Sequence, residues 1–142
     1  MISQKGKRAG FSLVEVLVGV ALVGIAMLGL AQLFIISITQ NARADTMTNA
    51  TFLSQQQIEQ LRTLTAAELN AMIGAVGDEV LDINVDGIYD YRRITQVRYL
   101  SEVYEVRVLV FNGEQTGASA GDLLADPSAY KVRTDITTVI TR

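Results

Sequence analysis

A single carboxylate at the start of an apolar run is the first feature with a chemical consequence. Glu15 precedes residues 16–38, which carry no charge, and an acid in the middle of a bilayer costs about 2.5 to 3.5 kcal/mol unless it is paired. If the chain is cut after Gly10, the new amine at Phe11 lies one helical turn from Glu15, on the same helix face. The spacing therefore predicts an ion pair between Glu15 and an amine that proteolysis creates, in the same chain or in a neighbouring copy.

The apolar run is long enough to cross a membrane as a helix. Residues 16–38 contain only two polar side chains, whereas about 20 apolar residues suffice for a span. The run also exceeds the apolar region of about 7 to 15 residues found in a cleaved secretory signal. Lys5, Lys7 and Arg8 precede it, so the positive-inside rule predicts a cytoplasmic N-terminus and an exported C-terminal part. We expect residues 11–38 to be a single transmembrane segment.

The residues from Gly10 to Glu15 read Gly-Phe-Ser-Leu-Val-Glu. With the basic leader before them and the apolar run after them, they resemble the class III signal of type IV pilins and type II secretion pseudopilins. In that family a prepilin peptidase cuts after the glycine, the new N-terminal phenylalanine is N-methylated, and the glutamate is needed for assembly. The resemblance implies cleavage between Gly10 and Phe11, methylation of Phe11, an assembly role for Glu15 and a leader of residues 1–10.

The resemblance also implies the surroundings of the chain. Its partners would be the prepilin peptidase, other pilins or pseudopilins and an assembly platform in the bacterial inner membrane. No cofactor is implied. The processed chain would lie in a cell-surface pilus or a periplasmic pseudopilus. Without the resemblance, Gly10 is a linker residue, Phe11 the first apolar residue of a span, and Glu15 an interfacial acid favoured by the helix dipole.

Two further features bear on the choice within the family. Gln32 stands where many major pilins have a proline, and residues 53–64 resemble the helix end of the type IV pilus modification proteins and of related minor pseudopilins. Both are typical of minor pilins and of pseudopilins, and we interpret the chain as a minor pilin-like subunit of a type IV pilus, in the filament or at its tip. The alternative is a minor pseudopilin of a type II secretion system. A single-pass anchor for a binding domain is a third interpretation, and it predicts no cleavage at Gly10.

The composition argues against several other functions. The chain contains no cysteine and no histidine, which excludes nucleophiles and bases of those types and disfavours a zinc site. Loss of the leader would leave 9 basic side chains against 15 acidic ones, a formal charge of −6. An acidic protein lacks the basic face that binding to nucleic-acid phosphates requires. We therefore expect neither an enzyme nor a nucleic-acid-binding protein.

The second half of the predicted helix changes from apolar to amphipathic. No glycine or proline occurs between Gly29 and Gly74, so one helix is predicted from about Phe11 to Leu64, with residues 39–64 as its amphipathic half. Thr65 and Glu68 form a capping-box pattern that predicts a second, short helix. The apolar stripe of the amphipathic half comprises Met47, Ala50, Leu53, Ile58, Leu61 and Leu64.

Residues 65–142 are predicted to form the head of an α+β fold. Alternation over 81–86, a turn at Asp86 and Gly87, and the runs 88–93, 103–111 and 130–141 predict about four antiparallel strands packed on the helix. In the last run, Tyr130, Val132, Ile136 and Ile140 are expected on one face. Residues 112–129 are rich in Gly, Ala and Ser and are expected to be a surface loop.

Two groups of residues raise the question of ligands. Asp82, Asn84 and Asp86 match the opening of a calcium loop, but Arg93 stands where that loop needs a glutamate. We therefore predict a strand end and its turn, and no metal site. Arg92, Arg93 and Arg98 are the main basic cluster after the span, and we interpret them as a solvated sheet face.

Overall fold

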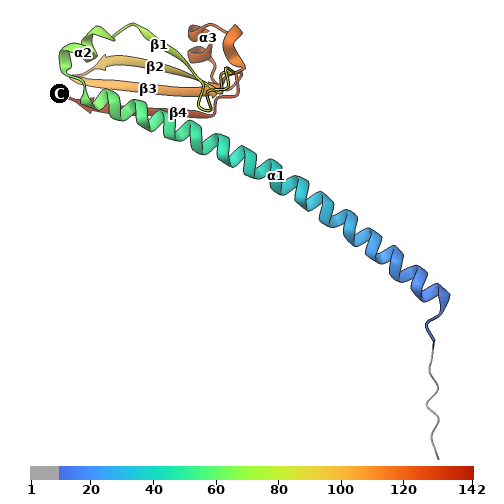
Figure 1. Cartoon of the computed structure of the whole chain (residues 1–142). Helices are drawn as coiled ribbons and strands as arrows, with labels where there is room; N and C mark the ends of the chain where they lie inside the picture. Colours follow the sequence, from blue (N-terminus) through green and yellow to red (C-terminus); the bar gives the residue numbers. More distant parts are fainter. Residues whose placement is uncertain (1–9) are drawn as a thin grey trace, which may run out of the picture. The chain divides into compact units, whose positions relative to one another are not determined.

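The computed structural model describes residues 10–142, so the rest of the predicted leader lies outside the described residues. Residue contacts divide the chain into two units, Met1–Ala42 and Arg43–Arg142. Figure 1 shows the elements in chain order. They are α1 (Leu13–Thr63), α2 (Ala66–Ala71), β1 (Val76–Leu81), β2 (Tyr91–Leu100), β3 (Val103–Asn112), a 3-10 turn (Gln115–Gly117), α3 (Ala120–Ala125) and β4 (Thr134–Thr141).

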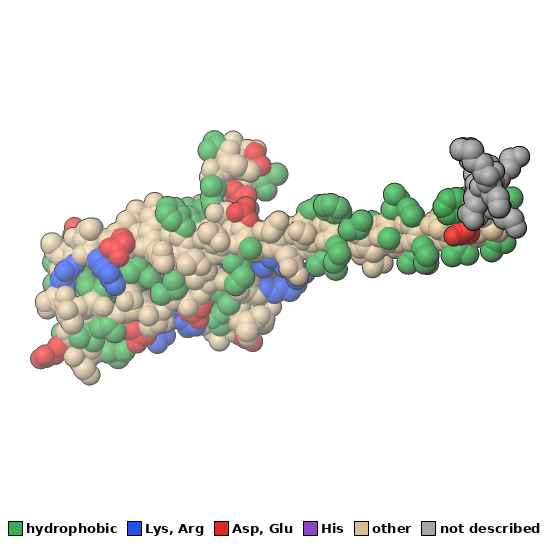
Figure 2. Space-filling model, turned by 90° about the horizontal axis from the view of Figure 1, so that it is seen from below, with side chains coloured by type: hydrophobic (Ala, Val, Ile, Leu, Met, Phe, Trp, Pro, Cys, Tyr) green, Lys and Arg blue, Asp and Glu red, His purple; other side chains and the backbone are tan. Residues whose placement is uncertain are grey.

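The first unit contains the apolar part of α1. The helix begins at Leu13 and continues without a break past Gln32, as predicted. Its large apolar side chains are all exposed, and Figure 2 shows hydrophobic side chains along both edges of this slender segment. α1 is long and apolar enough to cross a membrane by length and composition.

The second unit contains a four-stranded antiparallel sheet in the order β1-β2-β3-β4. A tight hairpin joins β2 to β3, with Tyr99 opposite Tyr104. Its two central residues, Ser101 and Glu102, have φ angles of 48° and 70°, which match the right-handed twist of the strands. Together with α1, this sheet confirms the predicted α+β fold.

One face of the sheet packs on α1. Ala50, Leu53, Ile58 and Leu61 of α1 are buried, and they contact the side chains of β2, β3 and β4 that point toward the helix. The predicted stripe is confirmed except at Met47, which is 56% exposed. The strand residues of this face include Tyr91, Val97, Tyr104, Val106, Val108, Val110 and Ile140.

The predicted capping box is present at the start of α2, directly after α1. The Thr65 side chain accepts a hydrogen bond from the Glu68 amide, and the Glu68 carboxylate accepts one from the Thr65 amide at 2.7 Å. The Thr65 amide and the Thr65 hydroxyl both donate to the Glu68 carboxylate and lower the pKa of Glu68. The short helix α2 that follows buries Leu69 against the α1 face of the sheet.

The predicted first strand and hairpin were wrong. The strand β1 covers 76–81, and residues 82–90 form a loop rather than a strand, a two-residue turn and the start of another strand. The cause is local, because the Asp82 carboxylate accepts hydrogen bonds from the amides of Val85 and Gly87 at 2.8 and 2.9 Å. Side-chain acceptors of this kind compete with the strand ladder for backbone groups.

The predicted surface loop before β4 is instead a folded cap. Helix α3 lies over the sheet face opposite α1 (Figure 1) and buries Leu123 completely. It packs on Ile94, Leu109 and Phe111, which point away from α1. The sheet is therefore covered on both faces at this end.

The prediction that Tyr130, Val132, Ile136 and Ile140 share one face of the last strand was also wrong. Tyr130 and Val132 pack with the α3 cluster, whereas Ile136 and Ile140 pack toward α1. Lys131 has a φ of 54°, which breaks the two-residue alternation before β4 begins at Thr134.

Candidate functional site

The predicted cleavage and assembly residues lie at the start of α1. Gly10 and Phe11 precede the first helical residue, Leu13, and both are exposed. Within residues 10–142 the space around Gly10 is open, because a side chain added there would meet no atom within 4 Å. The Val16 amide donates a hydrogen bond to the Ser12 carbonyl oxygen at 3.2 Å, which closes the first turn. The peptide bond between Gly10 and Phe11 is thus accessible and outside the helix, as a protease requires.

Glu15 lies in the first turn of α1. Its side chain is exposed, and within residues 10–142 it forms no hydrogen bond or ion pair. The next charged side chain along the helix is Arg43, which is far beyond the reach of a side chain. The carboxylate is therefore free to bind a cation from outside the described residues, and an amine at Phe11 would be four positions away.

Comparison with known families identifies this segment. Residues 5–31 match the family described as the prokaryotic N-terminal methylation motif. The chain carries the signal of the type IV pilin-like family. No curated protein and no solved structure matches the chain. The pilin-like signal implies processing by a prepilin peptidase and assembly with other pilins, and the apolar part of α1 fits anchoring in a membrane.

The second unit contains two buried arginines, Arg92 and Arg93, instead of the predicted solvated face. Arg92 binds both oxygens of Asp78, at 2.8 and 2.6 Å, and donates to the carbonyl oxygens of Gln115 and Ala118. This contact raises the pKa of Arg92 and lowers that of Asp78. Both guanidinium groups are used internally, because Arg93 binds Glu79 and the Leu53 carbonyl oxygen. Neither one is available to bind phosphates.

The sequence pattern shows adjacent cations but not their partners, so this role of Arg92 and Arg93 could not be predicted from it. Asp78 and Glu79 in β1 lie next to Arg92 and Arg93 only after the sheet forms. Two adjacent acids on one run and two adjacent bases on the next were the available signal, since antiparallel pairing puts opposite charges face to face.

The residues that match a calcium loop, Asp82, Asn84 and Asp86, form hydrogen bonds within the chain. Asp82 accepts two backbone amides, and Asn84 donates to Asp86 at 2.9 Å. Within residues 10–142, no group of three or more acidic, His or Cys side chains is placed to hold a metal ion. The twelfth position, Arg93, lies in β2 and binds Glu79, so the loop lacks the acidic ligand that a calcium loop needs there.

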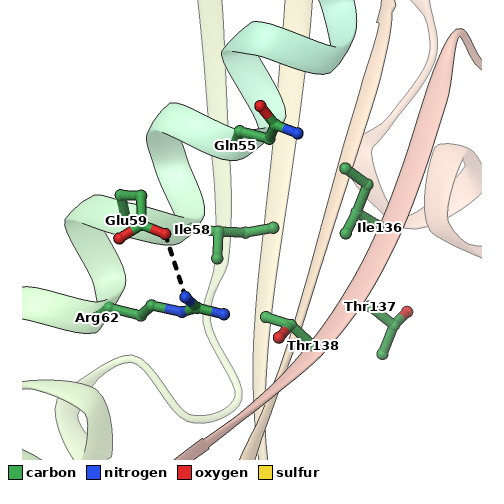
Figure 3. Close-up of a pocket in the computed structure, with 7 residues that line it drawn as sticks. All are labelled: Gln55, Ile58, Glu59, Arg62, Ile136, Thr137 and Thr138. Carbon is green, nitrogen blue, oxygen red and sulfur yellow. Dashed lines mark hydrogen bonds and ion pairs between the residues drawn. The ribbon is translucent and has the colours of Figure 1, made fainter.

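A shallow groove of about 400 Å³ lies between α1 and β4 (Figure 3). An ion pair between Glu59 and Arg62, with a distance of 3.2 Å, occupies its helix side. Thr137 and Thr138 line its strand side. The lining residues include no further acid, base or nucleophile pair, so we assign the groove no chemistry.

Proposed function

We propose that this chain is a minor pilin-like subunit of a type IV pilus. The observation that carries the proposal is the free carboxylate of Glu15 at the start of a long apolar helix. It lies four positions after Phe11, whose bond to Gly10 is accessible, and all three residues belong to the matched methylation signal. In a plain membrane anchor this acid would only cost free energy, because nothing in the bilayer pairs with it. In a subunit that assembles with others, the acid can pair with an amine and so select the neighbouring subunit. The role is structural rather than catalytic.

In this proposal, proteolysis creates the partner that Glu15 needs. The prepilin peptidase cuts between Gly10 and Phe11 on the cytoplasmic side, and the new amine of Phe11 is methylated and stays cationic. Glu15 then pairs with this amine or with that of an adjacent subunit. In the low dielectric of a membrane or filament core, an unpaired charge is costly, so the pair fixes the axial position of one helix against the next.

The remaining parts of the chain have separate roles in this proposal. Residues 11–38 hold the subunit in the inner membrane and later enter the filament core, and residues 39–64 form the half of α1 that carries the head. Residues 65–142 form the head on the outer side of the membrane. The unbroken helix at Gln32 supports a minor rather than a major subunit, since many major pilins have a proline there.

The state of the N-terminus tests the proposal. The chain is expressed with a prepilin peptidase, purified from membranes and examined by mass spectrometry of its N-terminal peptide. We expect a peptide that begins with methylated Phe11, and an uncut chain when Gly10→Val blocks cleavage. A wild-type chain that still begins with Met1 would favour the anchored binding domain. Recovery in a periplasmic pseudopilus, and not in sheared surface pili, would favour the type II secretion alternative.

A further inference from the structure

The loop between β1 and β2, residues 82–90, exposes apolar side chains, while two of its three acids are partly buried. Asp82 and Asp90 are half-buried, whereas the four large apolar side chains between them are exposed. This is the reverse of an ordinary polar surface loop, and clustered exposed apolar side chains mark an interaction site. The exposed fractions are 50% for Ile83, 86% for Val85, 68% for Ile88 and 52% for Tyr89.

Aspartate side chains of the loop accept hydrogen bonds from four of its backbone amides. Asp82 accepts the amides of Val85 and Gly87, Asp86 accepts the amide of Ile88 at 2.8 Å, and Asp90 accepts that of Ile83 at 2.9 Å. Each of these amides is then paired without water. Such internal pairing is what a segment needs where water is scarce, because an unpaired polar group is costly there.

The base of the loop is fixed to the sheet. The Asp90 amide donates to the Leu81 carbonyl oxygen, and the Gly113 amide donates to the Asp90 carbonyl oxygen, both at 2.9 Å. The backbone at Tyr89 approaches Gly113 so closely that a Cβ at position 113 would lie 1.7 Å from the Tyr89 oxygen. At the tip, Val85 has a φ of 57°, a strained conformation for a β-branched residue. The exposed side chains are therefore held outward.

The loop lies at the end of the sheet nearest to the apolar part of α1 along the chain. Tyr91, the first residue after the loop, donates its hydroxyl to the Thr46 carbonyl oxygen at 3.3 Å. Thr46 follows Ile38, the last residue of the apolar run, by eight residues, which is about 12 Å of helix. The headgroup region adds roughly 5 to 7 Å to each side of the hydrocarbon layer. The base of the loop is thus bonded to a residue that follows the predicted span by only eight positions along the chain.

We propose that the β1–β2 loop inserts its apolar side chains into the headgroup region of the membrane that anchors the chain. The inference rests on the proposed anchoring. Tyr89 suits this layer, since tyrosine places an apolar ring in lipid and a hydroxyl in water. The contact is apolar rather than electrostatic, because the charged side chains of the loop are Asp82, Asp86 and Asp90. It is therefore expected on zwitterionic phosphatidylcholine.

Single cysteines test this contact directly, because the chain contains none of its own. Val85→Cys and Ile88→Cys place a polarity-sensitive fluorophore on the loop. Val139→Cys is the matched control, since Val139 is 55% exposed and pairs with Glu105 toward the other end of the sheet. Each labelled full-length chain is reconstituted into phosphatidylcholine vesicles that contain lipids with a nitroxide near the headgroup.

We expect blue-shifted emission and several-fold stronger nitroxide quenching at positions 85 and 88 than at 139. Equal quenching at all three positions, with the chains still resistant to alkaline extraction, would overturn the loop contact and leave the anchoring intact. Blue-shifted emission without lipid quenching would show that protein, such as a second copy, covers the loop. This result would overturn the proposal that the loop contacts lipid. Extraction of all variants at alkaline pH would instead contradict the anchoring itself.

Discussion

The two units of the chain treat charge in apolar surroundings in opposite ways. In the second unit, Arg93 is almost fully buried, and it binds Glu79 and the Leu53 carbonyl oxygen. In the first unit, Glu15 sits among apolar side chains with no partner within residues 10–142. A charge that the fold satisfies contributes to the fold, whereas a charge that the fold leaves free points to a partner outside it. The charge of Arg93 is therefore paired within the head, whereas the charge of Glu15 needs a partner from outside the described residues.

The apolar side chains of α1 also differ between its two halves, since those of the second half are mostly packed and those of the first half are exposed. Substituting one leucine in each half should give the largest difference in the free energy of unfolding. Leu61 is 2% exposed and Leu33 is 63% exposed. Leu61→Ala should lower the free energy of unfolding of the head by about 2 to 5 kcal/mol, because it leaves a cavity in the core. Leu33→Ala should leave it unchanged.

Urea unfolding of the full chain in detergent micelles measures this difference. All five tyrosines, at positions 89, 91, 99, 104 and 130, lie in the second unit and the chain has no tryptophan, so tyrosine fluorescence reports on the head. Equal destabilisation by the two substitutions would contradict the division of α1 into an exposed and a packed half.

Removing the satisfied charge is expected to have the next largest effect. Arg93→Leu breaks the bonds to Glu79 and to the Leu53 carbonyl oxygen, and should destabilise the head by about 2 kcal/mol. Arg98→Leu is the control, because Arg98 is exposed on the same strand. Thermal unfolding by circular dichroism compares the two. A head that tolerates both substitutions equally would show that Arg93 does not secure the sheet to α1.

A smaller effect is expected where the packed half of α1 ends. Thr65→Ala removes the capping box of α2 and should cost about 1 kcal/mol. Thr51→Ala, at an exposed threonine hydroxyl that bonds within α1 at 2.8 Å, should change stability less. The same urea titration separates these two variants, and a larger loss for Thr51→Ala would refute the role of the cap.

The smallest expected effect concerns pH. The bond from Arg92 lowers the pKa of Asp78 in the folded chain, so this carboxylate stabilises the head above the ordinary aspartate pKa of about 3.9. The contribution is lost as the pH falls through the lowered folded-state pKa. Asp78→Asn should therefore reduce stability at neutral pH and flatten its dependence on acid. An unchanged acid dependence, followed by thermal unfolding between neutral and acidic pH, would count against this pair.

The helix and the N-terminal signal could be predicted from the sequence because both depend on local patterns. The apolar run, the stripe containing Ala50 and Leu61, and the Thr65 cap are each set by residues a few positions apart. Gly10, Phe11 and Glu15 occupy fixed places in a short motif, so the candidate site was visible before the fold was known.

The second face of the sheet could not be predicted in the same way. Leu109 and Phe111 alternate with Val108 and Val110, so β3 is apolar on both sides, a pattern that indicates burial on two faces. The residue that covers the second face, Leu123, lies in a segment rich in small residues that looked like a loop. Likewise, Val85 and Lys131 adopt positive φ angles that no rule for those residue types predicts, and each interrupts an expected strand.

Filament incorporation of a Glu15→Gln variant tests the central claim most directly. This substitution keeps the size of the side chain and removes its charge. Glu59→Gln, at an exposed position in the packed half of α1, is the matched control. Both variants should be processed between Gly10 and Phe11 and should fold as wild type by the tyrosine signal. We expect Glu15→Gln to be absent from purified filaments while Glu59→Gln is incorporated normally. Normal incorporation of processed Glu15→Gln would contradict the claim that this carboxylate selects the neighbouring subunit.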